Sequence, residues 1–261
     1  MESVAIKTIN LPSATIIIPA YNEERRISGL LEELTDFISV NKIEWSIIVS
    51  IDGSDHTEDI VKGFSSKYPF VSHVKNGERS GKGGAIKRVI QRATGELIIL
   101  MDADGSVKFT DILMNIMNVK DWDALIFNRY AYKENDIKAI RRIPSRAFNL
   151  LVRAFFGLKV KDTQCGFKVI RSKYAKEAFK KINVTNTFYD VALLYYIKMM
   201  GGKIREVNVK YNHNEDSKFN IIGEVLGQGV SLIAFRIRHS RFYKYIPSWA
   251  TDLYLRKFRW I

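Results

Sequence analysis

The chain contains 261 residues, of which 46% are hydrophobic, and it carries a formal net charge of +13 at pH 7. The length suits one large α/β domain or two small ones, and the charge favours an anionic partner: nucleic acid, a membrane surface or a phosphorylated substrate. The single cysteine, Cys165, excludes an intrachain disulfide. With no signal-peptide pattern and no apolar run of the roughly 18 residues that a transmembrane helix needs, the sequence predicts a soluble or peripheral protein of the cytoplasm.

Apolar runs of strand length alternate with helical patterns through the first hundred residues. We expect strands at 15–19, 46–51, 71–74 and 95–101, and helices at 23–40, 57–68 and 81–93. Asp55 or Thr57 is the expected cap of the second helix, and Gly95 stands where the third helix should have stopped. Strands that alternate with helices predict a mostly parallel, doubly wound sheet.

Two carboxylates, Asp102 and Asp104, directly follow the fourth expected strand. Residues two apart on a strand point to the same face, so both side chains can aim at one spot beyond its carboxyl end, where ligands bind in open α/β sheets. Hard oxygen donors at that spot suit a divalent cation, and the cation suits a diphosphate. The alternative interpretation is a turn at Asp104-Gly105, with Asp102 as an ordinary surface residue.

Two more segments should reach the same edge of the sheet. Asp52 ends the second expected strand, and the glycine-rich turn Gly81-Lys82-Gly83-Gly84 opens a helix. Free N–H groups and the positive end of the helix dipole would make this turn an anion cradle, to which Lys82 adds a point charge. The turn lacks Walker and Rossmann spacing and can also be a plain loop, but its place between acidic strand ends favours a nucleotide diphosphate site.

The second half of the chain changes character. We expect strands at 124–127 and 168–170, helices at 174–181 and 189–200, and an edge or antiparallel strand at 204–211. The segment 137–158 mixes arginines with large apolar residues, and Pro144 should break or start its helix. This segment can be a core helix with a solvated basic face, or a helix at a membrane interface.

The C-terminal tail begins near Ile221 as an apolar helical stretch and then becomes strongly basic. From Arg236 onward it has many basic residues and one acidic residue, Asp252, and aromatic residues lie among them. Aromatic rings beside basic residues are typical of proteins that contact lipid headgroups. A nucleic-acid surface, or a docked helix with a solvated basic face, remains an alternative.

Together these segments resemble the family 2 glycosyltransferases of the GT-A fold, and more narrowly the dolichyl-phosphate β-glucosyltransferases. The matching segments are IPAYNEE (18–24), DGS (52–54), RSGKGGAI (79–86), MDADG (101–105), DTQCGFK (162–168), FYDVALL (188–194) and Ser217-Lys218. IPAYNEE and DAD mark the wide family, whereas GKGGAI with DTQCGFK points to enzymes that glycosylate a polyprenyl phosphate. We expect residues 1–218 to form the GT-A domain, an α/β fold with a mostly parallel sheet flanked by helices, and 219–261 to pack on it as a basic amphipathic tail.

The resemblance implies a role for each matching position. The residues implied in binding the nucleotide sugar are Pro19, Ala20, Tyr21, Glu23, Asp52, Lys82, Gly83, Asp102, Ala103 and Asp104. Among them, Asp52 would contact the base or ribose, Asp102 would contact the sugar nucleotide, and Asp104 would hold Mg²⁺ or Mn²⁺ on the diphosphate. Asp102 and Asp104 are therefore also expected among the catalytic residues.

The acceptor side is implied in the same way. The residues implied in binding the acceptor phosphate are Arg129, Arg141, Arg142, Gln164, Ser217 and Lys218. Asp162 would line the sugar and acceptor site and either steer the sugar or accept a residual proton. Asp190 is the second candidate for that catalytic role.

The implied activity is an inverting, metal-dependent transfer of a hexose, with glucose from UDP-glucose as the first expectation, to dolichyl or polyprenyl phosphate at the cytoplasmic membrane face. The expected partners are a nucleotide sugar, the polyprenyl phosphate and an anionic membrane surface, with no nucleic acid. An enzyme that uses GDP-mannose, or one that glycosylates a protein or polysaccharide, is an alternative. A basic nucleic-acid-binding protein is a further alternative, which the acidic residues at the strand ends disfavour.

Overall fold

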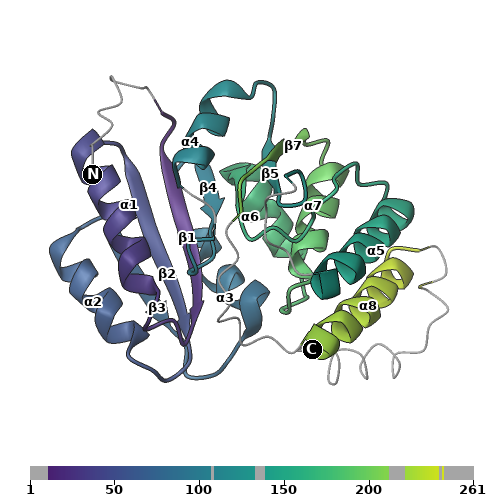
Figure 1. Cartoon of the computed structure of the whole chain (residues 1–261), viewed down its shortest axis with the longest axis horizontal. Coiled ribbons are helices and arrows are strands. Elements are labelled where there is room, and N and C mark those ends of the chain that lie inside the picture. The colour runs from purple at the N-terminus through teal and green to yellow at the C-terminus, as the bar shows by residue number, and fades with distance from the viewer. Residues whose placement is uncertain (1–10, 107–108, 133–138, 212–220, 241–242, 244–261) are drawn as a thin grey trace.

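The computed structural model describes residues 11–106, 109–132, 139–211, 221–240 and 243, and at 111–112, 139–143 and 221–226 it describes the backbone alone. Within these residues, seven strands form one sheet in the order β3-β2-β1-β4-β6-β5-β7 (Figure 1). The strands are β1 (Ala14–Tyr21), β2 (Trp45–Asp52), β3 (Val71–Lys75), β4 (Leu97–Leu100), β5 (Ala124–Asn128), β6 (Lys168–Arg171) and β7 (Ile204–Asn208). The sheet confirms the expected α/β class.

Helices cover both faces of this sheet. They are α1 (Ile27–Asn41), α2 (Thr57–Lys67), α3 (Gly81–Val89), the 3₁₀ turn η1 (Ile90–Arg92), α4 (Phe109–Asn118), α5 (Ala139–Phe156), α6 (Ser172–Lys181), α7 (Tyr189–Met199) and α8 (Ile221–Arg238). Alternate residues of one strand enter different cores: Ile16 and Ile18 pack with α1, α2 and α4, whereas Ile17 packs with the helices of the other face. Apolar side chains on both faces are what a central strand of a parallel sheet requires.

Strand direction brings several chain segments to one edge of the sheet. β6 runs antiparallel to β4 and β5, and the other neighbouring pairs are parallel. The carboxyl ends of β1, β2, β4 and β5 therefore meet the amino end of β6 at the same edge. The loops that carry most of the expected site residues leave the sheet from there, as they do in other open α/β sheets that bind ligands.

The structure refines the expectations for the rest of the chain. The strand near 204–211 is the edge strand that was one of the two alternatives, and it is parallel to β5, because its partner and not its own alternation sets its direction. Pro144 neither starts nor breaks a helix; it lies inside α5, where its missing N–H leaves the Ile140 carbonyl without its usual partner. The helix α4 was not predicted at all, although Phe109, Leu113 and Ile116 have helical spacing and are buried.

The C-terminal helix α8 lies beside α5, and both helices are at the end of the molecule away from α1 and α2 (Figure 1). Phe235 of α8 packs edge-to-face against Phe156 of α5, with 5.5 Å between the ring centroids. Among the described residues, no helix combines the length and the apolarity needed to cross a bilayer. The boundary at 218/219 stays a prediction.

Candidate functional site

The turns that end β1 and β2 are locked together. Asn22 and Gly53 both have positive φ values, 54° and 104°. The Asn22 Oδ1 atom accepts the Ser54 N–H at 3.0 Å, and a Cβ at Gly53 would overlap that same oxygen. Only glycine fits there, since the residue needs both the left-handed conformation and the space. The two turns therefore hold one edge of the site in a fixed shape.

The residues after β1 supply an exposed ring and a carboxylate. Tyr21 is 42% exposed, and the Arg79 guanidinium lies 4.3 Å from the centre of its ring. Burial raises the pKa of Glu23 above its ordinary value, and the charges of Asp104 and Asp102 add to the rise, although Arg26 opposes it. The carboxylates that follow β1 and β4 thus lie close enough for their negative charges to repel one another. Of the other two residues expected in this pocket, Ala20 is buried in the core and Pro19 is partly buried.

Asp52 is buried at the end of β2, and protein groups occupy both of its oxygens. Its Oδ2 accepts the N–H and the hydroxyl of Ser80, each at 2.7 Å, and its Oδ1 accepts an Arg88 N–H at 3.1 Å. These bonds tie β2 to the start of α3. In this structure the carboxylate therefore fixes the position of the helix that carries Lys82.

Lys82, in the first turn of α3, pairs with Asp102. The Lys82 Nζ lies 2.5 Å from the Asp102 Oδ1. Burial works against the charge on Lys82, yet attraction to Asp102, Asp190 and Asp104 raises its pKa. Burial would likewise raise the pKa of Asp102, but the positive charges of Lys82, Lys168 and Arg129 hold it below its ordinary value. The lysine is therefore cationic and Asp102 is ionised.

Asp102 and Asp104 lie in a turn, because β4 already ends at Leu100. The expected strand alternation thus does not place these side chains. Asp104 accepts the Ser106 N–H at 3.0 Å, and the intervening Ala103 is buried. Asp102 packs so closely on Gly166 that a Cβ at Gly166 would overlap its carboxyl group. The loop before β6 therefore fixes the place of the Asp102 carboxylate.

The glycine-rich turn packs tightly against the segment before α7. A Cβ at Gly81 would lie 2.6 Å from the Thr185 carbonyl oxygen, and one at Gly83 would lie 2.8 Å from the Tyr189 Cβ. The Gly84 N–H donates to the same Thr185 oxygen at 3.2 Å. Close helix packing therefore accounts for these glycines, and one of the N–H groups expected to face an anion bonds to the protein instead.

Arg129 and Asp162 form a two-pronged ion pair between the end of β5 and the loop before β6. The Arg129 Nε and Nη2 donate to the two oxygens of Asp162 at 2.7 and 2.9 Å, and the Arg129 backbone N–H donates at 3.1 Å. Asp162 is fully buried, while the Arg129 side chain keeps 19% of its surface exposed. Such a bidentate pair fixes the guanidinium plane. Asp162 therefore orients Arg129.

Lys168 and Asp190 form a second ion pair, which is fully buried. Their Nζ and Oδ1 atoms are 2.5 Å apart, and the Lys168 ammonium also donates to the Cys165 carbonyl at 2.5 Å. A buried pair of this kind is strongly destabilised when one partner is removed, because the other charge stays behind without compensation. Through its ion pair with Lys168, Asp190 thus helps to hold the 162–168 loop in place.

Tyr211 and Gln228 belong to this region but were not predicted from the sequence. The Tyr211 ring lies 5.5 Å from the Arg129 guanidinium, and burial raises the pKa of the Tyr211 hydroxyl, whereas Arg129 lowers it. Gln228 of α8 accepts from Gln164 at 2.5 Å and donates to Thr187 at 2.9 Å. Tyr211 follows β7, which ends at the edge of the sheet where the site lies, and this position could have indicated a site residue. Nothing in the sequence around Gln228 marks it.

Four expected acceptor residues cannot be placed. Ser217 and Lys218 lie outside the described residues, and the side chains of Arg141 and Arg142 do as well. Their assignment stays a prediction.

The acidic residues at the site suit a divalent cation that is shared with a ligand. In the described part of the chain, no group of three or more His, Cys, Asp or Glu residues could enclose a metal ion. Mg²⁺ and similar ions are commonly held by one or two carboxylates together with substrate phosphates. Because Lys82 occupies Asp102, Asp104 is the carboxylate best suited to such a role.

Comparisons with known proteins found a matching family model and similar individual proteins. The family model described as "Glycosyl transferase family 2" matches residues 15–179. A dolichyl-phosphate beta-glucosyltransferase of Drosophila melanogaster is 31% identical over 265 residues, which cover 92% of this chain and 81% of the relative. A protein of the same description from Homo sapiens is 29% identical over 246 residues, which cover 86% of this chain and 75% of the relative.

Solved structures share the fold. Glucosyl-3-phosphoglycerate synthase from Mycobacterium tuberculosis, crystallised with Mn²⁺, UDP-glucose and phosphoglyceric acid, matches with a TM-score of 0.65 at 15% identity, over 86% of this chain and 80% of that chain. Mannosyl-3-phosphoglycerate synthase from Rubrobacter xylanophilus matches with a TM-score of 0.64 at 16% identity, over 92% of this chain and 78% of that chain. These matches confirm the expected GT-A architecture.

Proposed function

The chain belongs to glycosyl transferase family 2, and we propose that it transfers a glucosyl group from UDP-glucose to dolichyl or another polyprenyl phosphate. The observation that carries this proposal is that two different charged sites lie at one edge of the sheet. Asp102, Asp104 and Lys82 lie at the end of β4, and the oriented Arg129 lies at the end of β5. The carboxylates and the lysine suit a metal-bound diphosphate, and the arginine suits an acceptor that carries a phosphate group.

On the donor side, Asp104 would hold Mg²⁺ or Mn²⁺ together with the diphosphate oxygens. When bound, the cation neutralises the charge that develops on the departing diphosphate. Lys82 adds a positive charge beside Asp102, and in our proposal Asp102 contacts the sugar nucleotide. The exposed ring of Tyr21, with Arg79 against it, offers a flat surface for the nucleotide base.

On the acceptor side, Arg129 binds the lipid phosphate through its partly exposed face. An oxygen of that phosphate forms a bond to the anomeric carbon while the bond from that carbon to the diphosphate breaks, and the electron pair leaves with UDP. The configuration at the carbon inverts in this single displacement. A phosphate oxygen is already anionic near neutral pH, so the step needs no strong general base.

The geometry favours positioning roles for the two carboxylates considered as bases. Both carboxylate oxygens of Asp162 accept hydrogen bonds from Arg129. The carboxylate of Asp190 accepts a hydrogen bond from the Lys168 ammonium. In our proposal Asp162 aims the guanidinium, and Asp190 keeps the loop in place. Gln164, which bonds to α8, lines the acceptor site from the same loop.

Attachment to the cytoplasmic face of a membrane would bring the lipid acceptor to the site. Three large apolar side chains of α5 are exposed: Leu150, Leu151 and Phe155. Ile233 and Ile237 are exposed on α8, which lies beside α5. Apolar side chains on basic helices are typical of proteins that lie in the interfacial layer of a bilayer.

Replacing Asp104 tests the donor half of the proposal. With radiolabelled UDP-glucose, Mn²⁺ and dolichyl phosphate, Asp104→Asn should slow transfer of label to the organic phase by at least about a hundredfold, since it removes a metal ligand. Asp59→Asn is the matched control, because Asp59 is a carboxylate on α2 with 71% of its side chain exposed. Near-normal turnover by a folded Asp104→Asn protein at saturating metal would refute the assignment.

A further inference from the structure

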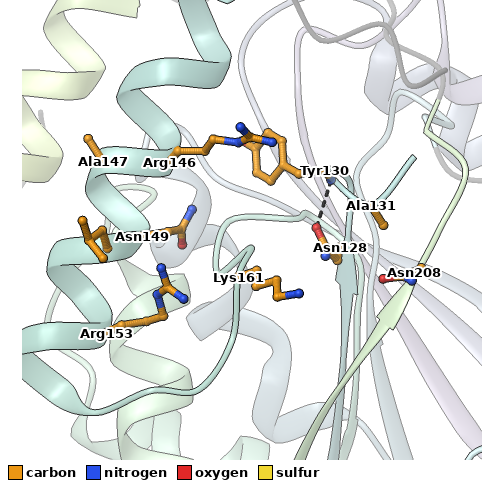
Figure 2. Close-up of a pocket in the computed structure, with 10 residues that line it drawn as sticks. Asn128, Tyr130, Ala131, Arg146, Ala147, Asn149, Arg153, Lys161 and Asn208 are labelled. Carbon is orange, nitrogen blue, oxygen red and sulfur yellow. Dashed lines mark hydrogen bonds between the residues drawn. The ribbon is translucent and has the colours of Figure 1, made fainter. Parts of the chain in front are cut away.

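A pocket of about 690 Å³ lies between α5 and the ends of β5 and β7 (Figure 2). Its volume is within the range of about 300–1,000 Å³ that is common for ligand sites. Arg146, Arg153 and Lys161 lie among its lining residues, and Asn128 and Asn208 border it from the strand ends. Figure 2 shows the two arginines reaching from α5 toward the strands, with Lys161 between them and β5.

Among the described residues that line this pocket, the charged ones are all basic. None of these described lining residues is acidic, and Arg146, Arg153 and Lys161 form no ion pair with any other described residue. Glu206 of β7 does not line the pocket, and its Oε1 atom instead accepts the backbone N–H groups of Lys161 and Asp162. Three positive charges that face one space repel each other, and an anion bound among them would offset this repulsion.

The two arginines are arranged for one ligand. Arg146 and Arg153 are seven residues apart on α5, which places them on the same helix face two turns from each other. Asn149, between them, directs its side chain to the Ser145 carbonyl and to Thr163. Planar guanidinium groups in such an array suit the oxygens of a phosphate group.

The pocket also has an apolar border. Leu150 lines it and is 58% exposed, and Ala131 and Ala147 line it as well. A ligand with a phosphate group and an apolar chain would find contacts for both parts here. The border thus points to a lipid headgroup as one source of the phosphate.

We propose that this pocket is a second anion site, separate from the donor site, that binds a phosphate group through Arg146, Arg153 and Lys161. The Arg129–Asp162 pair lies between this pocket and the carboxylates at the end of β4, since β5 and β7 are at the far side of β6. The inference does not depend on the proposed transfer reaction, because it rests only on the pocket's own lining.

The test compares two double variants of the full chain. Arg153→Ala with Lys161→Ala removes two positive charges from the pocket. Arg92→Ala with Lys173→Ala removes the same charge from exposed positions at the opposite sheet edge, where β4 starts and β6 ends. Sedimentation with phosphatidylcholine vesicles containing phosphatidylglycerol forms one arm, and calorimetric titration with glycerol 3-phosphate forms the other.

The pocket variant should bind the anionic vesicles, the soluble phosphate or both about tenfold more weakly than the wild type, and the control should stay within about twofold. The arm that responds identifies the source of the phosphate. Equal weakening of both double variants, or no weakening in either arm, would overturn the proposal. Binding of UDP with Mn²⁺, measured on the same variants, should not change and separates this site from the donor site.

Discussion

At the scale of single residues, pairs of side chains from distant segments shape the site. Arg129 and Asp162 are 33 positions apart, and Lys168 and Asp190 are 22 apart. The motifs identified these residue types, but a sequence does not show which carboxylate meets which cation, because only the folded sheet brings them together. The sequence left Asp162 and Asp190 as candidates for steering the sugar or accepting a proton, and their contacts in the folded chain favour positioning.

Gly166 gives a test at this scale. A Cβ at Gly166 would overlap the Asp102 carboxyl group, so Gly166→Ala should displace Asp102 and separate it from Lys82. We expect sugar transfer to fall on the order of a hundredfold, as a displacement of about 1 Å at a reacting centre can cost. Initial rates and the affinity for UDP-glucose check this.

Gly29→Ala is the control for that substitution. Gly29 is an exposed residue of α1, and nothing lies within 4 Å of a Cβ built there. This variant should keep its activity and gain up to about 1 kcal/mol in free energy of unfolding, because alanine favours helix more than glycine does. Wild-type rates for Gly166→Ala would show that Asp102 need not hold its place.

At the scale of secondary structure, burial explains what was predictable. The strands β1, β2 and β4 are apolar because both faces are covered, and their runs were recognised to within a few residues. The direction of β7 was not predictable, since alternation reports an edge position but not the partner that the strand pairs with. The path of α5 through Pro144 likewise depends on packing that the local sequence does not reveal.

The contact between α8 and the loops of the site gives a test at this scale. Gln228 is only 7% exposed and bonds both Gln164 and Thr187. Gln228→Ala should lower the free energy of unfolding by about 1–3 kcal/mol, because it leaves buried polar partners unsatisfied. We also expect a higher KM for the polyprenyl phosphate and an unchanged affinity for UDP-glucose.

Ile233→Ala serves as the control on the same helix, since Ile233 is 57% exposed. Its free energy of unfolding should change by no more than about 0.5 kcal/mol. If Gln228→Ala altered donor affinity and acceptor KM equally, α8 would support the whole domain and not the acceptor side in particular.

At the scale of the whole molecule, the proposed membrane attachment rests on charge and on exposed apolar surface. The net charge of +13 attracts anionic surfaces, and the exposed side chains of α5 and α8 can enter the interfacial layer. The composition predicted an anionic partner. It did not show where on the fold that partner would bind.

Removing the chain after Tyr243 tests the part of the tail that lies outside the described residues. That segment is rich in basic and aromatic residues, so its loss should weaken binding to anionic liposomes and reduce the salt dependence of that binding. Co-sedimentation over a series of salt concentrations measures both effects. Equal binding by the truncated and the complete chain would exclude a membrane role for this segment.

The most direct test of the central claim is a transfer assay with a panel of radiolabelled sugar nucleotides and two acceptors, dolichyl phosphate and dolichol. We predict that UDP-glucose with dolichyl phosphate gives the highest initial rate of label entering the organic phase, and that dolichol, which lacks the phosphate for Arg129, gives none. Label transferred equally to dolichol, or no organic-phase label from any sugar nucleotide with dolichyl phosphate, would contradict the account.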